Sequence, residues 1–241
     1  PGKDRAFGVS GLNAELAADD AGGRAVLREG PLRLELPNLL NAAVPFEMLA
    51  AEVEWRRDAE DWNLRAPTFR WRLLGSQGQG AMALQLPDGQ SPVLDLQAKF
   101  SAEDATRFKP FLLKHWGPDL NHYLSHAVLS ARVPHGELRV QGPLRDFPFH
   151  KHPDGIFALD LDATDGSLAY APDWPPLEKV SARLTFRGNS LDIVADRGTV
   201  RGATIERGHA RFADFSTGVL EVDGSATGTL PSYYAFLRES P

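Results

Sequence analysis

Apolar and polar residues alternate at every second position through most of this chain, and no other sequence feature restricts its fold as much. In one segment Leu94, Leu96, Ala98 and Phe100 alternate with Asp95, Gln97 and Lys99. The same alternation recurs in residues 32–36, 51–56, 69–73, 157–162, 180–187 and 220–223. Because successive side chains of a β-strand point to opposite faces, each segment is predicted as a strand with one apolar and one solvated face. About twelve to fifteen such strands fit in the chain, which favours a mainly β protein with antiparallel sheet over a β–α–β fold.

Short glycine-containing sequences separate the alternating segments and are predicted as turns. The turn signals are Asp88-Gly89, Asp165-Gly166, Gly188-Asn189 and Arg197-Gly198. The polar stretch Gly75-Ser-Gln-Gly-Gln-Gly80 is predicted as the tip of a hairpin.

One region, residues 101–130, breaks the alternation and is predicted as a helical insert. Ser101-Ala-Glu-Asp104 has the form of a capping box, so a short helix is expected from Ala102 until Pro110 interrupts it. A second helix is expected to start near Pro118, with apolar residues at helical spacing at Leu120, Tyr123, Leu124, Ala127 and Val128. The insert divides a first β part, residues 1–100, from a second β part, residues 131–241, within a single segment.

Composition excludes several classes of function. The formal net charge is −6 at pH 7, which argues against a nucleic-acid partner because phosphate binding depends on clustered Lys and Arg. Cysteine is absent, so disulfides, thiol catalysis and Cys-ligated zinc are excluded. No apolar run of about eighteen residues and no signal peptide is found. The chain opens at Pro1 without a methionine, and we expect it to be a piece of a longer protein.

Histidines are the first candidate metal ligands. His122 and His126 share a helix face, but the HExxH spacing of zinc proteases is missing and His115 lies beyond a predicted helix break. His150 and His152 flank a lysine and lack an evident third ligand. We therefore predict no metal site at these histidines.

Asp160-Leu-Asp162-Ala-Thr-Asp165-Gly166 resembles a calcium loop, but its glycine comes one residue late and Ala171 stands where a bidentate Glu is needed. No GxSxG, GxGxxG or P-loop motif occurs, and nothing singles out a pair of catalytic carboxylates. The sequence therefore predicts a protein that is not an enzyme and uses no metal or other cofactor.

Several segments, taken together, resemble the AsmA-like family of bacterial envelope proteins, in particular its YhdP branch. They follow one another in the order and spacing of that family. The segments are Gly8-Val-Ser-Gly-Leu12, Arg107-Phe-Lys-Pro110, Gly136-Glu-Leu-Arg-Val-Gln-Gly142, Leu144-Arg-Asp-Phe-Pro-Phe149, Leu168-Ala-Tyr-Ala-Pro-Asp-Trp-Pro175 and Phe236-Leu-Arg-Glu-Ser-Pro241.

The resemblance implies a fold and a function. The fold would be a curved antiparallel sheet that forms an open groove. The function would be non-enzymatic transfer of phospholipid between the inner and outer membranes of a Gram-negative envelope, with the acyl chains shielded by apolar side chains. The chain would be periplasmic, within a protein anchored in the inner membrane by an N-terminal helix that this chain lacks. Free sheet edges would allow the fragment to associate with itself.

Apolar residues on the alternating strands are the candidates for contact with acyl chains. They are Leu34, Val53, Trp55, Phe69, Trp71, Leu96, Phe157, Leu184, Phe186 and Leu220. Two other interpretations stay open: a structural or interaction module of β-sandwich type, whose apolar faces pack on each other, and a carbohydrate-active enzyme on a β scaffold with two converging carboxylates.

Overall fold

A computed structural model describes residues 8–59, 61–114, 117–149 and 154–241 of the chain. Most of the strands in these residues form one twelve-stranded antiparallel sheet in the order β15-β14-β13-β12-β11-β10-β9-β8-β7-β6-β3-β2. Its strands are β2 (Ala14–Ala18), β3 (Gly22–Leu27), β6 (Met48–Asp58), β7 (Asp61–Leu73), β8 (Ser76–Leu86), β9 (Val93–Ala102), β10 (Val128–Pro143), β11 (Ile156–Leu168), β12 (Leu177–Arg187), β13 (Ser190–Val200), β14 (Ala203–Phe212) and β15 (Leu220–Thr227).

A second, three-stranded sheet is formed by β1 (Gly8–Ser10), β4 (Leu32–Glu35) and β5 (Val44–Phe46). The helical segments are η1 (Ala105–Phe111), α1 (Gly117–Ala127), η3 (Leu144–Asp146), η4 (Phe215–Thr217) and α2 (Leu230–Glu239). The C-terminal helix α2 packs through Phe236, whose ring centroid lies 5.6 Å from that of Trp174.

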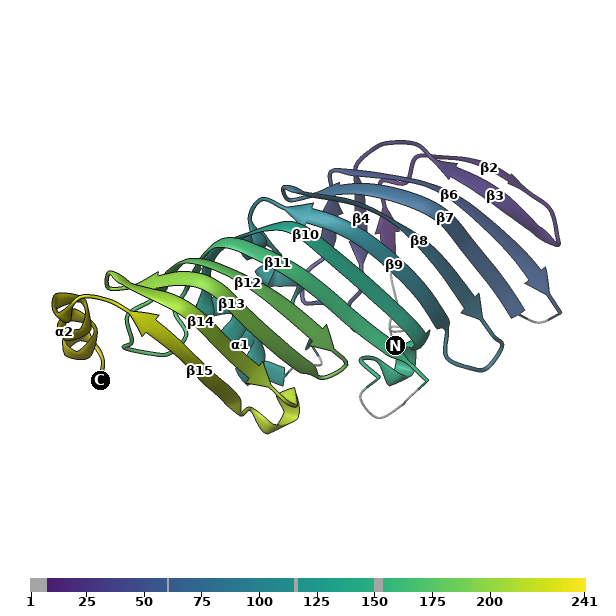
Figure 1. The fold of residues 1–241 in the computed structure, drawn as a ribbon. Helices are drawn as coiled ribbons and strands as arrows, with labels where there is room; N and C mark the ends of the chain where they lie inside the picture. Colours follow the sequence, from purple (N-terminus) through teal and green to yellow (C-terminus); the bar gives the residue numbers. More distant parts are fainter. Residues whose placement is uncertain (1–7, 60, 115–116, 150–153) are drawn as a thin grey trace.

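The large sheet is a meander that arches and stays open (Figure 1). Strands that follow one another in the chain pair with each other, except that β4 and β5 intervene between β3 and β6. The sheet ends at two edge strands, β2 and β15, whose residues are almost all exposed. The predicted fold class, a mainly β protein built on a curved and open antiparallel sheet, is confirmed.

The helical insert lies within residues 101–130 as predicted, but its boundaries differ. Strand β9 continues to Ala102, and Asp104 caps η1 by accepting a hydrogen bond from the Thr106 backbone N–H at 3.0 Å. Pro110 lies inside η1 and does not end it, since the φ of proline, about −65°, suits a 3₁₀ turn. Val128, predicted in the second helix, is the first residue of β10. Strands β9 and β10, which flank the insert, pair directly.

Mid-strand irregularities replace two of the predicted turns. Asp165-Gly166 lies within β11, where Asp165 has a φ of 53° and the register with β12 shifts between Ala163 and Gly166. Arg197-Gly198 lies within β13. Such β-bulges bend a strand without ending it. The turn predictions at Asp88-Gly89 and Gly188-Asn189 are confirmed.

The hydrophobic core is concentrated on one side of the sheet, over β9–β15. Its buried members are Val140, Phe149, Phe157, Phe186, Leu191, Phe212 and Phe215. Three aromatic residues from outside the sheet strands contribute to it: Phe147 and Phe149 from the segment after β10, and Phe215 from η4. Tyr123 of α1 adds an edge-on contact with Phe212 at 6.3 Å. We call the buried members, together with the partly buried residues packed against them, the core cluster.

The exposed surface of the protein is large for its mass. It measures 14844 Å², whereas a compact monomer of 26.4 kDa exposes about 10,600 Å². The excess of about 4,200 Å² is expected for a sheet that is covered on only part of its faces. A β-sandwich would bury this surface between two sheets of similar size. The β-sandwich alternative is therefore wrong as a description of the fold.

Candidate functional site

One face of the large sheet is apolar across all twelve strands. Residues that lie directly opposite one another in the register share a face, and one such line crosses every strand without a polar side chain. We call it the central row: Ala14, Leu27, Ala51, Phe69, Gly80, Ala98, Leu138, Leu159, Phe186, Leu191, Phe212 and Leu220. At about 4.8 Å between strands, this row is about 50 Å long.

A second row beside the first is also entirely apolar or glycine. It consists of Leu49, Trp71, Gly78, Phe100, Gly136, Leu161, Leu184, Ile193, Ala210 and Val222. Both rows lie on the same side of the sheet, and we call this whole side the apolar face.

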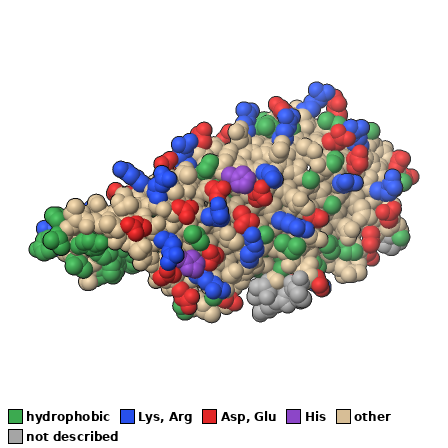
Figure 2. All heavy atoms as spheres, viewed as in Figure 1, with side chains coloured by type: hydrophobic (Ala, Val, Ile, Leu, Met, Phe, Trp, Pro, Cys, Tyr) green, Lys and Arg blue, Asp and Glu red, His purple; other side chains and the backbone are tan. Residues whose placement is uncertain are grey.

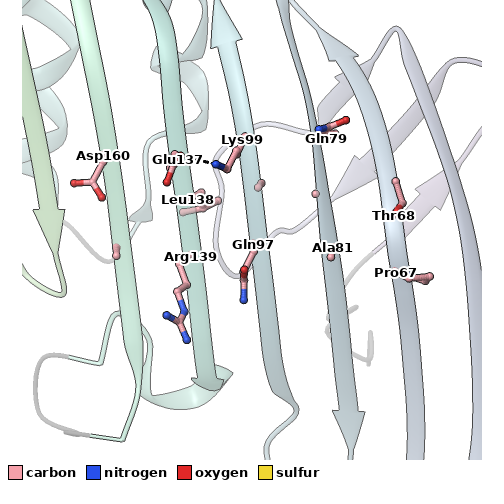
Figure 3. Close-up of a pocket in the computed structure, with 13 residues that line it drawn as sticks. Pro67, Thr68, Gln79, Ala81, Gln97, Lys99, Glu137, Leu138, Arg139 and Asp160 are labelled. Carbon is pink, nitrogen blue, oxygen red and sulfur yellow. Dashed lines mark ion pairs between the residues drawn. The ribbon is translucent and has the colours of Figure 1, made fainter.

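The opposite face of the sheet is polar, and Figure 2 shows acidic and basic side chains intermingled over it. One register line on this face consists of Arg70, Gln79, Lys99, Glu137, Asp160, Thr185, Asp192, Arg211 and Glu221. A shallow depression of about 640 Å³ lies here, lined by polar and some apolar residues of β7–β11 (Figure 3). Its most prominent pair is Lys99 and Glu137, whose Nζ and Oε1 atoms lie 2.9 Å apart.

Charge pairs across neighbouring strands set the electrostatics of the polar face. The Lys99 ammonium, by its hydrogen bond and its charge, lowers the pKa of Glu137 below its usual range. His209 lies between two carboxylates, with Nε2 2.8 Å from Asp192 and Nδ1 3.3 Å from Asp223. The hydrogen bond to Asp192 is the largest cause of a raised pKa for His209.

Nine of the ten candidate contact residues lie on the apolar face. Phe69, Phe186 and Leu220 belong to the central row, and Trp71 and Leu184 belong to the second row. Val53 and Trp55 are two and four residues from Ala51 on β6, on the same face. Leu96 and Phe157 both pair with Val140, which is two residues from Leu138 of the central row, so they lie on the same face. The tenth candidate, Leu34, lies in the three-stranded sheet.

The face divides into a covered part and an open part. Phe157 and Phe186 are only 7% and 6% exposed and belong to the core cluster, against which Leu96, Leu184 and Leu220 also pack. By contrast Val53, Trp55, Phe69 and Trp71 are half-buried and lie outside that cluster. Alternation within a strand does not reveal this division, because the cover comes from residues outside the sheet strands.

Aromatic rings in the open part lie across glycines of neighbouring strands. Phe69 lies over Gly80, and Trp71 over Gly78, close enough that a Cβ on either glycine would overlap the ring. Both glycines belong to the stretch that was predicted as a hairpin tip. This prediction is correct for Gly75 and wrong for the rest, because the turn is at Leu74 and Gly75 and β8 begins at Ser76. The available signal was that Gly78 and Gly80 continue the period-two pattern of Met82 and Leu84.

Evidence for catalysis or metal binding is lacking in the part of the chain that the structure describes. No group of three or more His, Asp or Glu side chains there could hold a metal ion. His126 Nδ1 lies 2.7 Å from the His122 carbonyl oxygen, while His115, His150 and His152 are outside the described residues.

The acidic residues of the calcium-like sequence have protein partners. Arg187 donates to both carboxylate oxygens of Asp160 at 2.8 Å, and Arg183 lies 3.4 Å from Asp162. The carboxyl pKa shifts that are evident, at Asp104 and Glu137, are downward. A glycosidase acid needs the opposite shift.

Comparison with protein families gives a match over nearly the whole chain. The model described as YhdP protein matches residues 3–241. The chain belongs to the YhdP family. YhdP proteins are envelope proteins of a lipid-transport family that is not known as enzymatic. No curated protein and no solved structure matches the chain. Among the described residues, no helix is long and apolar enough to span a membrane.

Proposed function

We propose that this segment shields phospholipid acyl chains as they pass between the inner and outer membranes. The observation that supports this most is the central row: twelve consecutive strands each present an apolar residue or glycine on one face of an open sheet. A ligand pocket usually encloses a single small molecule, whereas a row about 50 Å long suits an extended, mobile apolar chain.

The energetics favour acyl chains as the occupant. Each CH₂ group transferred out of water contributes about 0.8 kcal/mol, so a chain of about sixteen carbons contributes about 12 kcal/mol when fully shielded. Residues such as Phe69 and Trp71 are half-buried, so they have surface left for such a chain. The lipid headgroup would stay in water beside the open sheet, because no charged side chain lies in either apolar row.

The cellular setting belongs to the same proposal. The segment would lie in the periplasm as part of a protein anchored in the inner membrane through an N-terminal helix outside this chain. Phospholipid would be its ligand, and no chemical step would be needed.

Site-specific photocrosslinking tests the proposal with neighbouring residues on opposite faces. A benzophenone amino acid replaces Phe69 on the apolar face or Arg70 on the polar face of the intact protein in cells. We expect phospholipid adducts, identified by mass spectrometry, at position 69 and none at position 70. Equal capture at both positions, or none at position 69, would count against a lipid-binding groove and favour a structural role.

A further inference from the structure

Three glycines of β8 and β10 lie against three aromatic rings in the open part of the apolar face. Gly80 lies beneath Phe69, Gly78 beneath Trp71, and Gly136 beneath Phe100. The added Cβ of Gly80 would lie 2.7 Å from Cζ of Phe69, and that of Gly136 would lie 2.6 Å from Cζ of Phe100. Real Cβ atoms essentially never approach another heavy atom so closely, so each ring occupies the space that a side chain would need.

Backbone conformation does not explain these glycines. None of the three has a positive φ, so a left-handed conformation is not the reason for glycine, although at Gly78 and Gly80 a carbonyl oxygen of β9 also approaches the added Cβ. Glycine inside a strand is destabilising relative to alanine and offers no side chain to pack. In this area the ring over each glycine occupies the space that a side chain at that position would fill.

The three pairs form one continuous area. In the second row Trp71, Gly78, Phe100 and Gly136 follow one another on β7, β8, β9 and β10. In the central row Phe69 and Gly80 lie beside Trp71 and Gly78, and the rings of Phe69 and Trp71 stack with centroids 5.6 Å apart. We call this area, from β7 to β10, the ring floor.

We propose that the ring floor is the track on which acyl chains lie, and that Gly78, Gly80 and Gly136 determine its clearance. This inference rests on the proposed function and adds which residues set the depth of the groove. Because glycine lies beneath each ring, no further side chain projects from these positions across the path of a chain, so the chain is shielded without being fixed at one position. Strands β11–β14 differ, because their row residues pack within the core cluster.

Gly136 is the position at which clearance can be tested most cleanly. The three nearest atoms to an added Cβ there all belong to the Phe100 ring. At Gly80 the Gln97 carbonyl oxygen is also in the way, and at Gly78 the Lys99 carbonyl oxygen lies 2.6 Å away, so alanine would disturb the backbone. Gly136→Ala therefore has to lift or turn one ring.

Gly208 provides a matched control. It lies opposite Ala195 on the same side of the sheet, and its added Cβ would lie 3.4 Å from the nearest atom, Ala195 Cβ, an ordinary contact. Phe100→Ala supplies the rescue, because removal of the ring frees the space above residue 136.

The experiment places a benzophenone amino acid at Met82, on β8 beside the ring floor, in the intact protein in cells. We expect Gly136→Ala to lose most of the phospholipid adduct, Gly208→Ala to keep it, and Gly136→Ala with Phe100→Ala to recover it. Melting curves of the purified variants accompany each measurement. If Gly136→Ala fails to fold, recovery of both folding and adduct in the double variant supports the same ring contact.

Two results would overturn the inference while leaving the proposed function intact. One is a folded Gly136→Ala variant that captures as much lipid as the unmodified protein. The other is a double variant that stays as deficient as the single one, because the defect would then not act through the Phe100 ring. Absence of any adduct in the unmodified protein at both Met82 and Phe69 would instead refute the proposed function.

Discussion

Truncation of two phenylalanines in the same register row should have opposite consequences for stability and for ligand capture. Phe69 and Phe186 both belong to the central row. Phe186 is 6% exposed and packs in the core cluster, with its ring centroid 6.4 Å from that of Phe215. Phe69 is half-buried, outside that cluster. Phe186→Ala and Phe69→Ala therefore remove the same atoms from a covered and an open environment.

The expected losses in the free energy of unfolding differ between the two variants by about twofold or more. A fully buried Phe→Ala substitution costs about 3–5 kcal/mol, since it removes apolar contacts and leaves a cavity. The partly exposed ring of Phe69 loses only part of the transfer term and leaves no closed cavity, so about 1–1.5 kcal/mol is expected. In a chain of 241 residues, each kcal/mol lowers the melting temperature by about 2–4 °C. We expect a decrease of about 6–20 °C for Phe186→Ala and of about 2–6 °C for Phe69→Ala.

Circular dichroism melts of the purified segment measure the stability change, and lipid capture from a probe at Met82 in the intact protein measures function. We expect Phe69→Ala to reduce capture more than Phe186→Ala, although it destabilises less. Equal melting temperatures for the two variants would refute the division into covered and open parts. A larger loss of capture for Phe186→Ala at a temperature where it is fully folded would refute the assignment of the open part to the ligand.

Three further predictions concern the polar face, the sheet edges and metals. The raised pKa of His209 means that its contribution to stability is present below its unfolded pKa and is lost as pH rises through the folded value. His209→Gln should therefore reduce the dependence of the melting temperature on pH between about pH 6 and about pH 8. An unchanged dependence on pH would contradict this. Leu16 on β2 and Val222 on β15 are 69% and 67% exposed at the two edges of the sheet. The double variant Leu16→Lys, Val222→Lys should therefore show less self-association than the unmodified segment in analytical ultracentrifugation. Identical sedimentation of the double variant and the unmodified segment would contradict this. Treatment with EDTA should leave the melting temperature unchanged, and a decrease would reveal a structural metal.

The sequence was sufficient to predict the strands, because alternation is a local property that each strand shows by itself. Apolar segments such as residues 94–100 lie in the strands expected, and the insert that interrupts them is helical. It also identified nine residues that lie on one face, since a regular strand keeps every second residue on the same side. Leu34 follows the same local pattern but lies in the small sheet, because local pattern does not specify which strand is the neighbour.

Two kinds of glycine signal were misread for a common reason. Asp165-Gly166 and Gly75–Gly80 were predicted as turns because glycine and aspartate are common where a chain reverses. In the structure Asp165 is part of an irregular stretch of β11, where Gly166 and Leu168 still pair with β12 although the register shifts on either side of Gly166. Gly78 and Gly80 make room for rings from β7. Both roles depend on the adjacent strand, and a single segment contains no information about it.

The distribution of cover over the apolar face explains how one sheet can be both stable and open. An apolar face left wholly in water would not support folding, since burial of apolar surface is the main favourable contribution. In this chain Phe147, Phe149 and Phe215 extend from outside the sheet strands to cover one part of the face, and they form a core with Phe157 and Phe186. The strands next to this core, from β9 to β6, are joined to it by the continuous backbone hydrogen bonding of the sheet. Stability supplied at one place thereby permits exposed apolar surface at another, so residues that stabilise the sheet and residues that contact a ligand can be different members of the same row.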